Sequence, residues 1–407
     1  MSNNNGFLAF LKHNIPKMIW AIGISSLLAN IATSVIFAGT ALYMKVILGA
    51  TVSTIGLLEA VVEAISYGVR IFSGVISDFL RRRKAVMIVG FILLAISKPL
   101  LAFSKNVSQV FLARTLDRIG NGIQASPREA FIGDTAPSNV KGACYGLRQS
   151  LAVIGSTLGG IFGVIVMKVS NNDFELMFLL ASIPAFISVF VIIFVVKEKM
   201  EVKSKKHLRR PIKFHDLKLL GGKFWLLMSI VVVFMLGRFS EIFIALNACD
   251  NYGLDIAYGT LISVLFNMTY ALSSYPAGKF SDKFEKTTIL LSGFLILLVA
   301  HITIYTAPNI FFLFLGTVIW GLQIGITQSI FAILVSDYVP KDLRGTGFGV
   351  FYFVTAISTA IASLNAGILS NASGTESTAF LYGAVLCSCA IILLLTFKKK
   401  LHVQDFN

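Results

Sequence analysis

The chain has 407 residues, of which 56% are hydrophobic and 14% are charged, and its mean hydropathy is +0.80. A soluble domain carries about 25% charged residues, so the composition excludes an ordinary soluble protein and indicates an integral membrane protein. The formal net charge of +15 is assigned to membrane topology and lipid contact rather than to nucleic-acid binding.

Apolar runs of roughly 20 residues, long enough to cross a ~30 Å hydrocarbon core as a helix, recur along the whole chain. They are continuous rather than alternating, which favours helices over a membrane β-barrel. The twelve expected transmembrane helices cover 17–44, 52–79, 85–104, 107–135, 142–168, 174–197, 223–249, 255–281, 287–306, 310–337, 345–370 and 376–397. The polar and basic start, MSNNNGFLAFLKHNIPK, is followed by no cleavage site, so we expect the first span to be retained.

Lys and Arg are distributed unevenly among the predicted loops. If both termini are cytoplasmic, inner loops and tails hold 25 of the 35 basic residues, whereas the outer loops hold only Lys45, Lys105 and Lys168. This excess obeys the positive-inside rule, so we expect a multi-pass protein of the cell (inner) membrane with both termini cytoplasmic. We also expect a monomer surrounded by membrane lipid.

The two halves of the chain resemble each other. The segment GVISDFLRRRK (74–84) recurs as GKFSDKFEK (278–286), and GDTAPSNVKGACYG (133–146) recurs as VSDYVPKDLRGTGFG (335–349). The offsets of 204 and 203 residues are close to half the chain length, which indicates two six-helix bundles in the same orientation. The predicted domains are an N-terminal bundle at 1–197, a basic cytoplasmic linker at 198–222 and a C-terminal bundle at 223–407.

Charged residues also occur inside the predicted spans, where each costs at least ~2.5 kcal/mol and therefore needs a partner or a cavity. A rise of ~1.5 Å per residue places Asp117 and Arg118 roughly 15 Å deep. The set, with spacings that place neighbours on one helix face, comprises Glu59, Glu63, Arg114, Asp117, Arg118, Arg238 and Glu241. Because an acid beside an Arg can bind a proton when the Arg moves, we predict proton coupling here, with Asp117 first. The alternative is permanent ion pairs. Lys98 is expected to extend toward the membrane surface.

A second charged group is expected at the cytoplasmic helix ends. An Asp at a helix end beside an Arg cluster can latch helices together through charge-assisted hydrogen bonds that break when a gate opens. The predicted gate comprises Asp78, Arg82, Arg83, Arg128, Glu129, Asp134, Arg148, Asp282 and Asp337. For the loop residues the alternative is a solvated basic loop that reflects topology alone. For Arg128, Glu129, Asp134 and Arg148 the alternative is a substrate site.

Three short patterns carry a resemblance to a known family. The first lies between the second and third spans and contains Gly74, Ile76, Ser77, Asp78, Arg82 and Arg83. The second is Arg114 with Gly120 in the fourth span, and the third is Gly146, Gly155, Gly159 and Gly163 in the fifth. These patterns resemble the loop motif and the two helix motifs of the major facilitator superfamily. The departures from the family patterns are Phe79, Arg81, Asp117, Arg118, Gly160 and Val164.

The resemblance implies an all-α membrane protein of two six-helix bundles, which moves a small molecule by alternating access without a cofactor, a metal or enzymatic activity. The fifth-span glycines resemble those of family antiporters, which favours efflux by proton antiport, although they also suit close helix packing. The alternatives are a proton symporter importing a small metabolite, for which Arg114, Arg118 and Arg238 would suit an anion, a receptor that does not transport, and an intramembrane enzyme. The resemblance implies a cavity near Asn30, Thr33, Phe37, Asn267, Tyr270, Trp320, Gln323 and Tyr352, any of which could instead serve packing.

Overall fold

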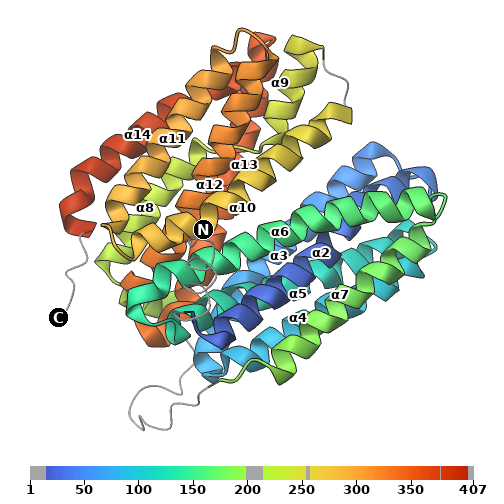
Figure 1. Cartoon of the computed structure of the whole chain (residues 1–407), viewed down its shortest axis with the longest axis horizontal. Helices are drawn as coiled ribbons and strands as arrows, with labels where there is room; N and C mark the ends of the chain where they lie inside the picture. Colours follow the sequence, from blue (N-terminus) through green and yellow to red (C-terminus); the bar gives the residue numbers. More distant parts are fainter. Residues whose placement is uncertain (1–14, 199–213, 254–256, 376, 402–407) are drawn as a thin grey trace, which may run out of the picture.

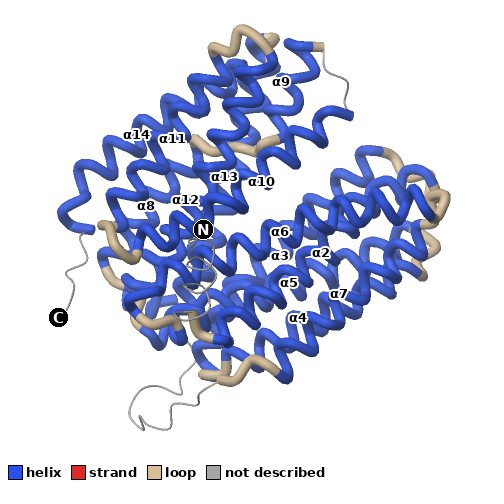
Figure 2. The backbone as a smooth tube through the Cα atoms, viewed as in Figure 1, coloured by secondary structure: helices blue, strands red, loops and turns tan. Residues whose placement is uncertain are grey.

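The computed structural model describes residues 15–198, 214–253, 257–375 and 377–401, and this part of the chain is helical with connecting loops (Figure 2). The first group of helices is α2 (Lys17–Val46), α3 (Val52–Leu80), α4 (Arg83–Ala102), α5 (Val107–Thr135), α6 (Lys141–Val169) and α7 (Phe174–Phe194). The second is α8 (Gly222–Leu236), α9 (Ile242–Tyr252), α10 (Ala257–Ser281), α11 (Lys286–Tyr305), α12 (Ile310–Tyr338), α13 (Arg344–Ser373) and α14 (Ser377–Leu401). Short 3₁₀ turns cover Ser138–Val140, Phe214–Leu220 and Lys341–Leu343.

Each group of helices packs as a separate bundle (Figure 1). In the first, α2 packs against α6 and α7, and α4 against α5 and α7; in the second, α12 packs against α10 and α11. The groups meet where α3 crosses α13 and α6 crosses α10. We call the end of the molecule where α3 and α7 finish and α4 begins the linker end. The helices of the two groups diverge away from it (Figure 1).

The helix bounds agree with eleven of the predicted spans to within four residues. In the described part of the chain, eight helices are long and apolar enough to cross a membrane: α2, α4, α6, α7, α11, α12, α13 and α14. The helices α3 and α5 fall outside this set because they carry the charged residues singled out above. Membrane crossing by the remaining helices, the internal repeat and the domain boundaries stay predictions. Most of the predicted linker, 199–213, lies outside the described residues.

The expectation of one continuous helix at 223–249 is wrong. The chain leaves the helical conformation between α8 and α9, a break drawn in tan in Figure 2. Side chains from distant helices bond to the backbone exposed there: His301 Nε2 lies 2.9 Å from the Gly237 carbonyl oxygen, and the Ser240 N–H donates to Ser363 Oγ at 3.2 Å. These bonds satisfy backbone groups that a helix would otherwise pair, so a polar break inside the bundle is stable.

Candidate functional site

The most enclosed charge cluster lies between α4 and α5. Asp117 is 1% exposed, and its carboxylate forms an ion pair with the fully buried ammonium of Lys98. Arg118 Nε and Arg114 Nη1 lie 3.4 and 3.6 Å from the second carboxylate oxygen. Three cations therefore surround one acid, an arrangement typical of a permanent ion cluster. The expectation that Lys98 extends toward the membrane surface is wrong, because its ammonium ends on Asp117.

Two glutamates on α3 complete this cluster. Arg114 Nη2 lies 2.6 Å from Glu59 Oε2, and Arg118 Nη1 lies 3.6 Å from Glu63 Oε2. The Glu59 and Glu63 side chains are 25% and 42% exposed, so they form the accessible edge of the cluster. With Lys98 and Asp117, the cluster contains three acids and three bases and is electrically balanced. The structure thus brings together five of the seven predicted central residues.

The other two, Arg238 and Glu241, lie in the break between α8 and α9. Their prediction as an i, i+3 pair on a helix face is wrong because the backbone is not helical there. Arg238 instead lines a cavity of about 330 Å³ between the two groups of helices. The polar side chains that line it are Tyr67 and Arg70 from α3, Arg238, Gln328 from α12, and Tyr352, Thr355, Thr359 and Ser363 from α13.

Two arginines face this cavity without a carboxylate at ion-pair distance, although Glu241 interacts electrostatically with Arg238 from farther away. The Arg70 guanidinium lies over the rings of Tyr67 and Tyr352, at 4.5 and 5.0 Å from their centroids. In the described part of the chain, buried Arg70 Nε and Arg238 Nη1 have no hydrogen-bond partner, and neither arginine has a carboxylate within 4.0 Å. A buried cation without an anion is costly, so the cavity is suited to a negatively charged molecule.

A further charge cluster, which we call the floor, lies beside the cavity residue Tyr352. Oε1 of the fully buried Glu129 forms an ion pair with Arg148, 2.9 Å from Nη2, and accepts a hydrogen bond from Arg128 Nη2 at 3.3 Å. Tyr352, which lines the cavity, interacts electrostatically with Glu129, Arg148, Arg128 and Arg70. These three residues were predicted to join the gate aspartates. The structure corrects that grouping, because their ion pairs in the described part of the chain are with one another.

The linker end is closed by two similar contacts that cross between the groups. The Asp78 carboxylate accepts from the Gly345 and Thr346 N–H groups at 3.0 and 2.6 Å, and Asp282 accepts from Gly142 and Ala143 N–H at 2.6 and 2.9 Å. Each carboxylate thus caps the start of a helix in the other group, where the helix dipole favours an anion. Burial raises the pKa of Asp282 to about 6.

Glycine makes these contacts possible because the backbones touch. A Cβ atom on Gly142 would lie 2.1 Å from the Gly278 carbonyl oxygen, and one on Gly74 equally close to that of Gly345. No side chain fits at such separations. The loop glycine Gly74 is therefore explained by close approach of α3 to α13.

Other charged residues strengthen the closed end. Arg83 pairs with Asp78 and, at 3.3 Å, with Asp134, which also lies 2.6 Å from Arg344 Nη1. Lys141 Nζ lies 2.6 Å from Asp337, on the other group. Of the predicted gate, the structure gathers Asp78, Arg83, Asp134, Asp282 and Asp337 here. Arg82 lies exposed at the start of α4. Lys141 and Arg344 were missed.

The fifth-span glycines lie where α6 packs against its neighbours. A Cβ atom on Gly155 would lie 2.2 Å from the Leu27 carbonyl oxygen of α2, and one on Gly146 2.6 Å from that of Ser274 of α10. Gly159 and Gly163 face α2 as well. Close packing therefore accounts for Gly146, Gly155 and Gly159, whereas a Cβ atom on Gly163 would make ordinary contact with Val35 at 3.9 Å. The first three glycines do not by themselves distinguish antiport from other modes.

The predicted cavity residues are distributed more widely than expected. Tyr352 lines the cavity, and the Tyr270 hydroxyl accepts from Gln149 Nε2 across the two groups beside its floor. Trp320 and Gln323 are buried inside the second group, where the Trp320 ring packs 4.8 Å from the His301 ring, which agrees with the packing alternative. The remaining four, Asn30, Thr33, Phe37 and Asn267, are not among the residues that line the cavity.

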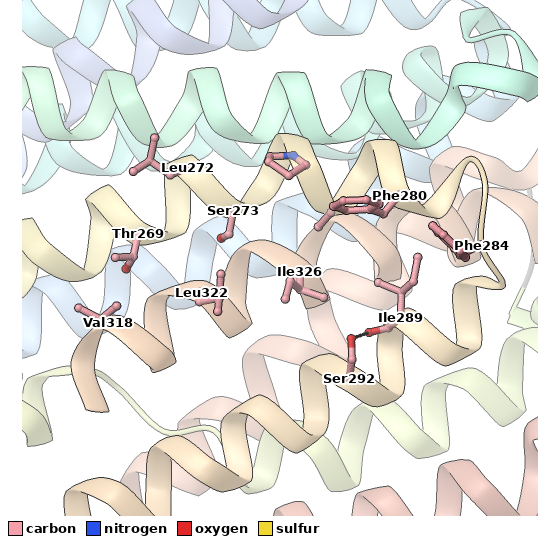
Figure 3. Close-up of a pocket in the computed structure, with 12 residues that line it drawn as sticks. Thr269, Leu272, Ser273, Phe280, Phe284, Ile289, Ser292, Val318, Leu322 and Ile326 are labelled. Atoms are coloured by element: carbon pink, nitrogen blue, oxygen red, sulfur yellow. Dashed lines mark hydrogen bonds between the residues drawn. The ribbon is translucent and has the colours of Figure 1, made fainter. Parts of the chain in front are cut away.

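A larger hollow of about 520 Å³ lies on α10, α11 and α12 (Figure 3). No charged side chain lines it, and Leu272 and Phe280 on its wall are 63% and 56% exposed. The Ser292 hydroxyl bonds to the Ile289 carbonyl of its own helix at 2.7 Å (Figure 3). This hollow therefore offers little to fix a polar molecule, unlike the smaller cavity between the groups.

Several residues of the central cavity were missed from the sequence although a signal existed. Glu59, Glu63, Tyr67 and Arg70 are spaced i, i+4, i+8 and i+11, so they lie on one face of α3. Following the helix face of Glu59 and Glu63 two turns further along the sequence would have identified Arg70. The cavity wall on α13, where Thr355, Thr359 and Ser363 recur every four residues, shows the same spacing.

Known proteins resemble this chain along most of its length. The family model described as Major Facilitator Superfamily matches residues 22–262 and 227–405. An uncharacterized MFS-type transporter of Methanocaldococcus jannaschii is 28% identical over 386 residues, covering 94% of this chain and 95% of its own. The structure of the human organic anion transporter is similar with a TM-score of 0.76 at 16% identity, covering 93% of this chain and 99% of its own.

The structure of the Escherichia coli fucose:proton symporter is similar to the same degree, with a TM-score of 0.76 at 14% identity, covering 93% of this chain and 98% of its own. The names of the two solved structures give different substrates, an organic anion and fucose. At this level of identity the similarity therefore shows the fold alone. The family match over nearly the whole chain, together with the helical architecture and its apolar spans, shows that this protein is a multi-pass membrane transporter of the major facilitator superfamily.

Proposed function

We propose that this transporter carries a small organic anion across the membrane by alternating access, together with protons. The observation that carries the proposal is the pair Arg70 and Arg238, which face one cavity without a carboxylate partner in the described part of the chain. An arginine fork binds a carboxylate through two charge-assisted hydrogen bonds, which gives both affinity and orientation.

The charge around the cavity supports an anionic substrate. Arg70, Arg238 and the floor residues Arg128 and Arg148 all interact electrostatically with Tyr352 or Tyr270, and within the described residues Glu129 is the acid that forms ion pairs with two of these arginines. An excess of positive charge in a low-dielectric interior is relieved when an anion enters. A volume of about 330 Å³ lies at the lower limit of the usual ~300–1,000 Å³ range for ligand pockets, which favours a small molecule.

The closed contacts support an alternating-access cycle. The hydrogen bonds and ion pairs that join the two groups, within the described residues, lie at the linker end or beside the cavity floor. The excess of Lys and Arg in the loops at this end favours a cytoplasmic position, with both termini inside the cell. On that assignment the structure is an outward-facing state of a carrier in the cell membrane.

Proton antiport with efflux is the second candidate. It is favoured by the resemblance of Gly146, Gly155, Gly159 and Gly163 to family antiporters, although their packing against α2 and α10 gives them another role. An anion that enters a positively charged cavity favours uptake of a proton rather than its release, so we place symport first.

The test uses purified protein in proteoliposomes with a trapped pH dye. Radiolabelled succinate, gluconate and 4-hydroxybenzoate are added outside, with fucose as a neutral solute, tetraethylammonium as a cation and protein-free liposomes as the leak control. We expect at least one anion to enter with acidification of the lumen. Alkalinisation during anion entry would establish antiport instead, and uptake of fucose or the cation without any anion would refute the anionic substrate.

A further inference from the structure

Glu129 combines three features that no other acid of the described chain shares. It is fully buried, its Oε1 forms ion pairs with two arginines, and its Oε2 has no hydrogen-bond partner among the described residues. A proton can therefore bind at Oε2 while Oε1 keeps its ion pair with Arg148, 2.9 Å from Nη2. Protonation and the arginine contact are compatible at the same side chain.

Glu129 belongs to the same electrostatic unit as the substrate cavity. Tyr352 interacts with Glu129, Arg148 and Arg128 on one side and with Arg70 on the other, and its ring lies 5.0 Å from the Arg70 guanidinium. The groups that interact with this acid come from four helices: Arg128 (α5), Tyr145 and Arg148 (α6), Tyr270 (α10) and Tyr352 (α13).

The charge balance of this unit links an anion to a proton. With the cavity empty, the negative charge of Glu129 is paired with Arg128 and Arg148. An anion bound at Arg70 and Arg238 adds negative charge to the unit and competes for the arginines, which favours a proton on Glu129. By thermodynamic reciprocity, a proton on Glu129 strengthens anion binding by the same factor.

We infer that Glu129 is the site that takes up the coupled proton when an organic anion binds between Arg70 and Arg238. The inference rests on the proposed function and assigns its coupling residue. Asp117, the acid favoured by the sequence, suits this role less because Lys98, Arg114 and Arg118 surround it and it does not line the cavity. Anion and proton then move in the same direction.

The test compares Glu129→Gln with Glu129→Asp and the wild type, using the three radiolabelled anions in proteoliposomes. Two quantities are measured: exchange of labelled for unlabelled anion without a gradient, and accumulation driven by an imposed proton gradient. For Glu129→Gln we expect exchange within about threefold of the wild type, accumulation reduced at least tenfold, and anion binding that no longer depends on pH. Glu129→Asp restores accumulation in part, with a displaced pH profile. Glu175→Gln, at an exposed position in the first turn of α7, is the matched control and remains like the wild type.

The outcomes separate the two proposals. A wild-type protein that takes up none of the anions refutes the proposed function and this inference with it. Anion uptake that is coupled to protons equally in the wild type and in Glu129→Gln overturns the inference alone. If Glu129→Gln does not fold, Glu129→Asp decides: a displaced pH profile supports Glu129 as the proton site, and a wild-type profile refutes it.

Discussion

The two charge clusters inside this transporter differ in how completely they neutralise themselves. Around Asp117, three acids and three bases pair within 3.6 Å, and the centre is sealed from solvent. At the cavity, Arg70 and Arg238 have no carboxylate within 4.0 Å in the described chain, and Glu129 pairs only with the two arginines of the floor. A balanced cluster stabilises the bundle by itself, whereas an unbalanced one is complete only with a ligand.

The balanced cluster is expected to give the largest effect on stability. Lys98→Met removes the cation closest to Asp117 and leaves the acid with weaker contacts at 3.4 and 3.6 Å. We expect the free energy of unfolding to fall by about 3 kcal/mol, measured as thermal unfolding in detergent. The double variant Lys98→Met/Asp117→Asn should recover at least half of this loss, because neither charge remains unpaired. An unchanged unfolding temperature in Lys98→Met would show that the ion pair is dispensable.

The unbalanced cluster should show the opposite pattern. Arg70→Gln and Arg238→Gln each remove charge-assisted hydrogen bonds worth about 1.5–3 kcal/mol, so anion affinity should fall roughly 10- to 100-fold. Thermal stability should stay constant or rise, since no carboxylate lies within ion-pair distance of either arginine in the described chain. Arg238→Lys, which keeps the charge but loses the fork, should be intermediate. A lower unfolding temperature in both glutamine variants, together with unchanged anion affinity, would show that the two arginines stabilise the fold and do not bind the anion.

The sequence predicted most helix positions because apolar runs set them directly, but it did not predict the break after Leu236. The stretch GRFSE (237–241) shows polar residues inside an apolar run. Whether such a stretch remains helical depends on His301 and Ser363, which bond to its backbone from more than 60 residues away. Helix existence is a local property, whereas continuity here depends on tertiary partners.

The same limit applies to the site. Depth and spacing identified Arg114, Asp117 and Arg118 because a charge inside a membrane is conspicuous in any sequence. Which charges meet depends on the rotation of each helix about its axis, and the sequence does not reveal that rotation. For this reason the sequence predicts Lys98 at the membrane surface and Glu129 in the gate, whereas Lys98 pairs with Asp117 and Glu129 pairs with Arg128 and Arg148. Ser and Thr residues such as Thr355 give little signal, because in membrane helices they commonly bond to their own backbone.

The edge of the balanced cluster offers a sharper test than its centre. Glu59 is 25% exposed and accepts two hydrogen bonds from Arg114 Nη2, at 2.6 and 2.8 Å. Glu59→Gln should lower the free energy of unfolding by roughly 1–2 kcal/mol, because one charge-assisted partner is lost. Proton-driven anion accumulation should change less than threefold in the same protein. Loss of accumulation at unchanged stability would instead return the proton role to Glu59.

Asp282 is an acid whose hydrogen bonds come from backbone N–H groups rather than from a cation, so it tests how a buried carboxylate behaves without an ion pair. Its carboxylate is bonded to the N–H groups of Gly142 and Ala143, and burial raises its pKa to about 6 from an ordinary value of 3.8. When the linker end opens, the solvated carboxylate returns toward the ordinary value. The state with the higher pKa is favoured by protons, so acidification from pH 7 to pH 5 stabilises the closed end, and this effect is lost as the pH rises through 6. We expect a few-fold rise in the closed fraction, measured as the distance between spin labels at exposed positions 82 and 342.

The variant Asp282→Asn tests whether the pH dependence of the closed fraction arises from Asp282 rather than from the balanced cluster around Asp117. The amide keeps an oxygen that can accept from Gly142 N–H but cannot titrate, so the closed fraction should become constant between pH 7 and pH 5. Asp78, which accepts from Thr346 N–H but also pairs with Arg83, has a cation beside it and serves as the internal contrast. A pH response that persists in Asp282→Asn would assign the titration to another group, and an opening of the linker end by acid would show that the helix dipole, rather than burial, dominates the environment of Asp282.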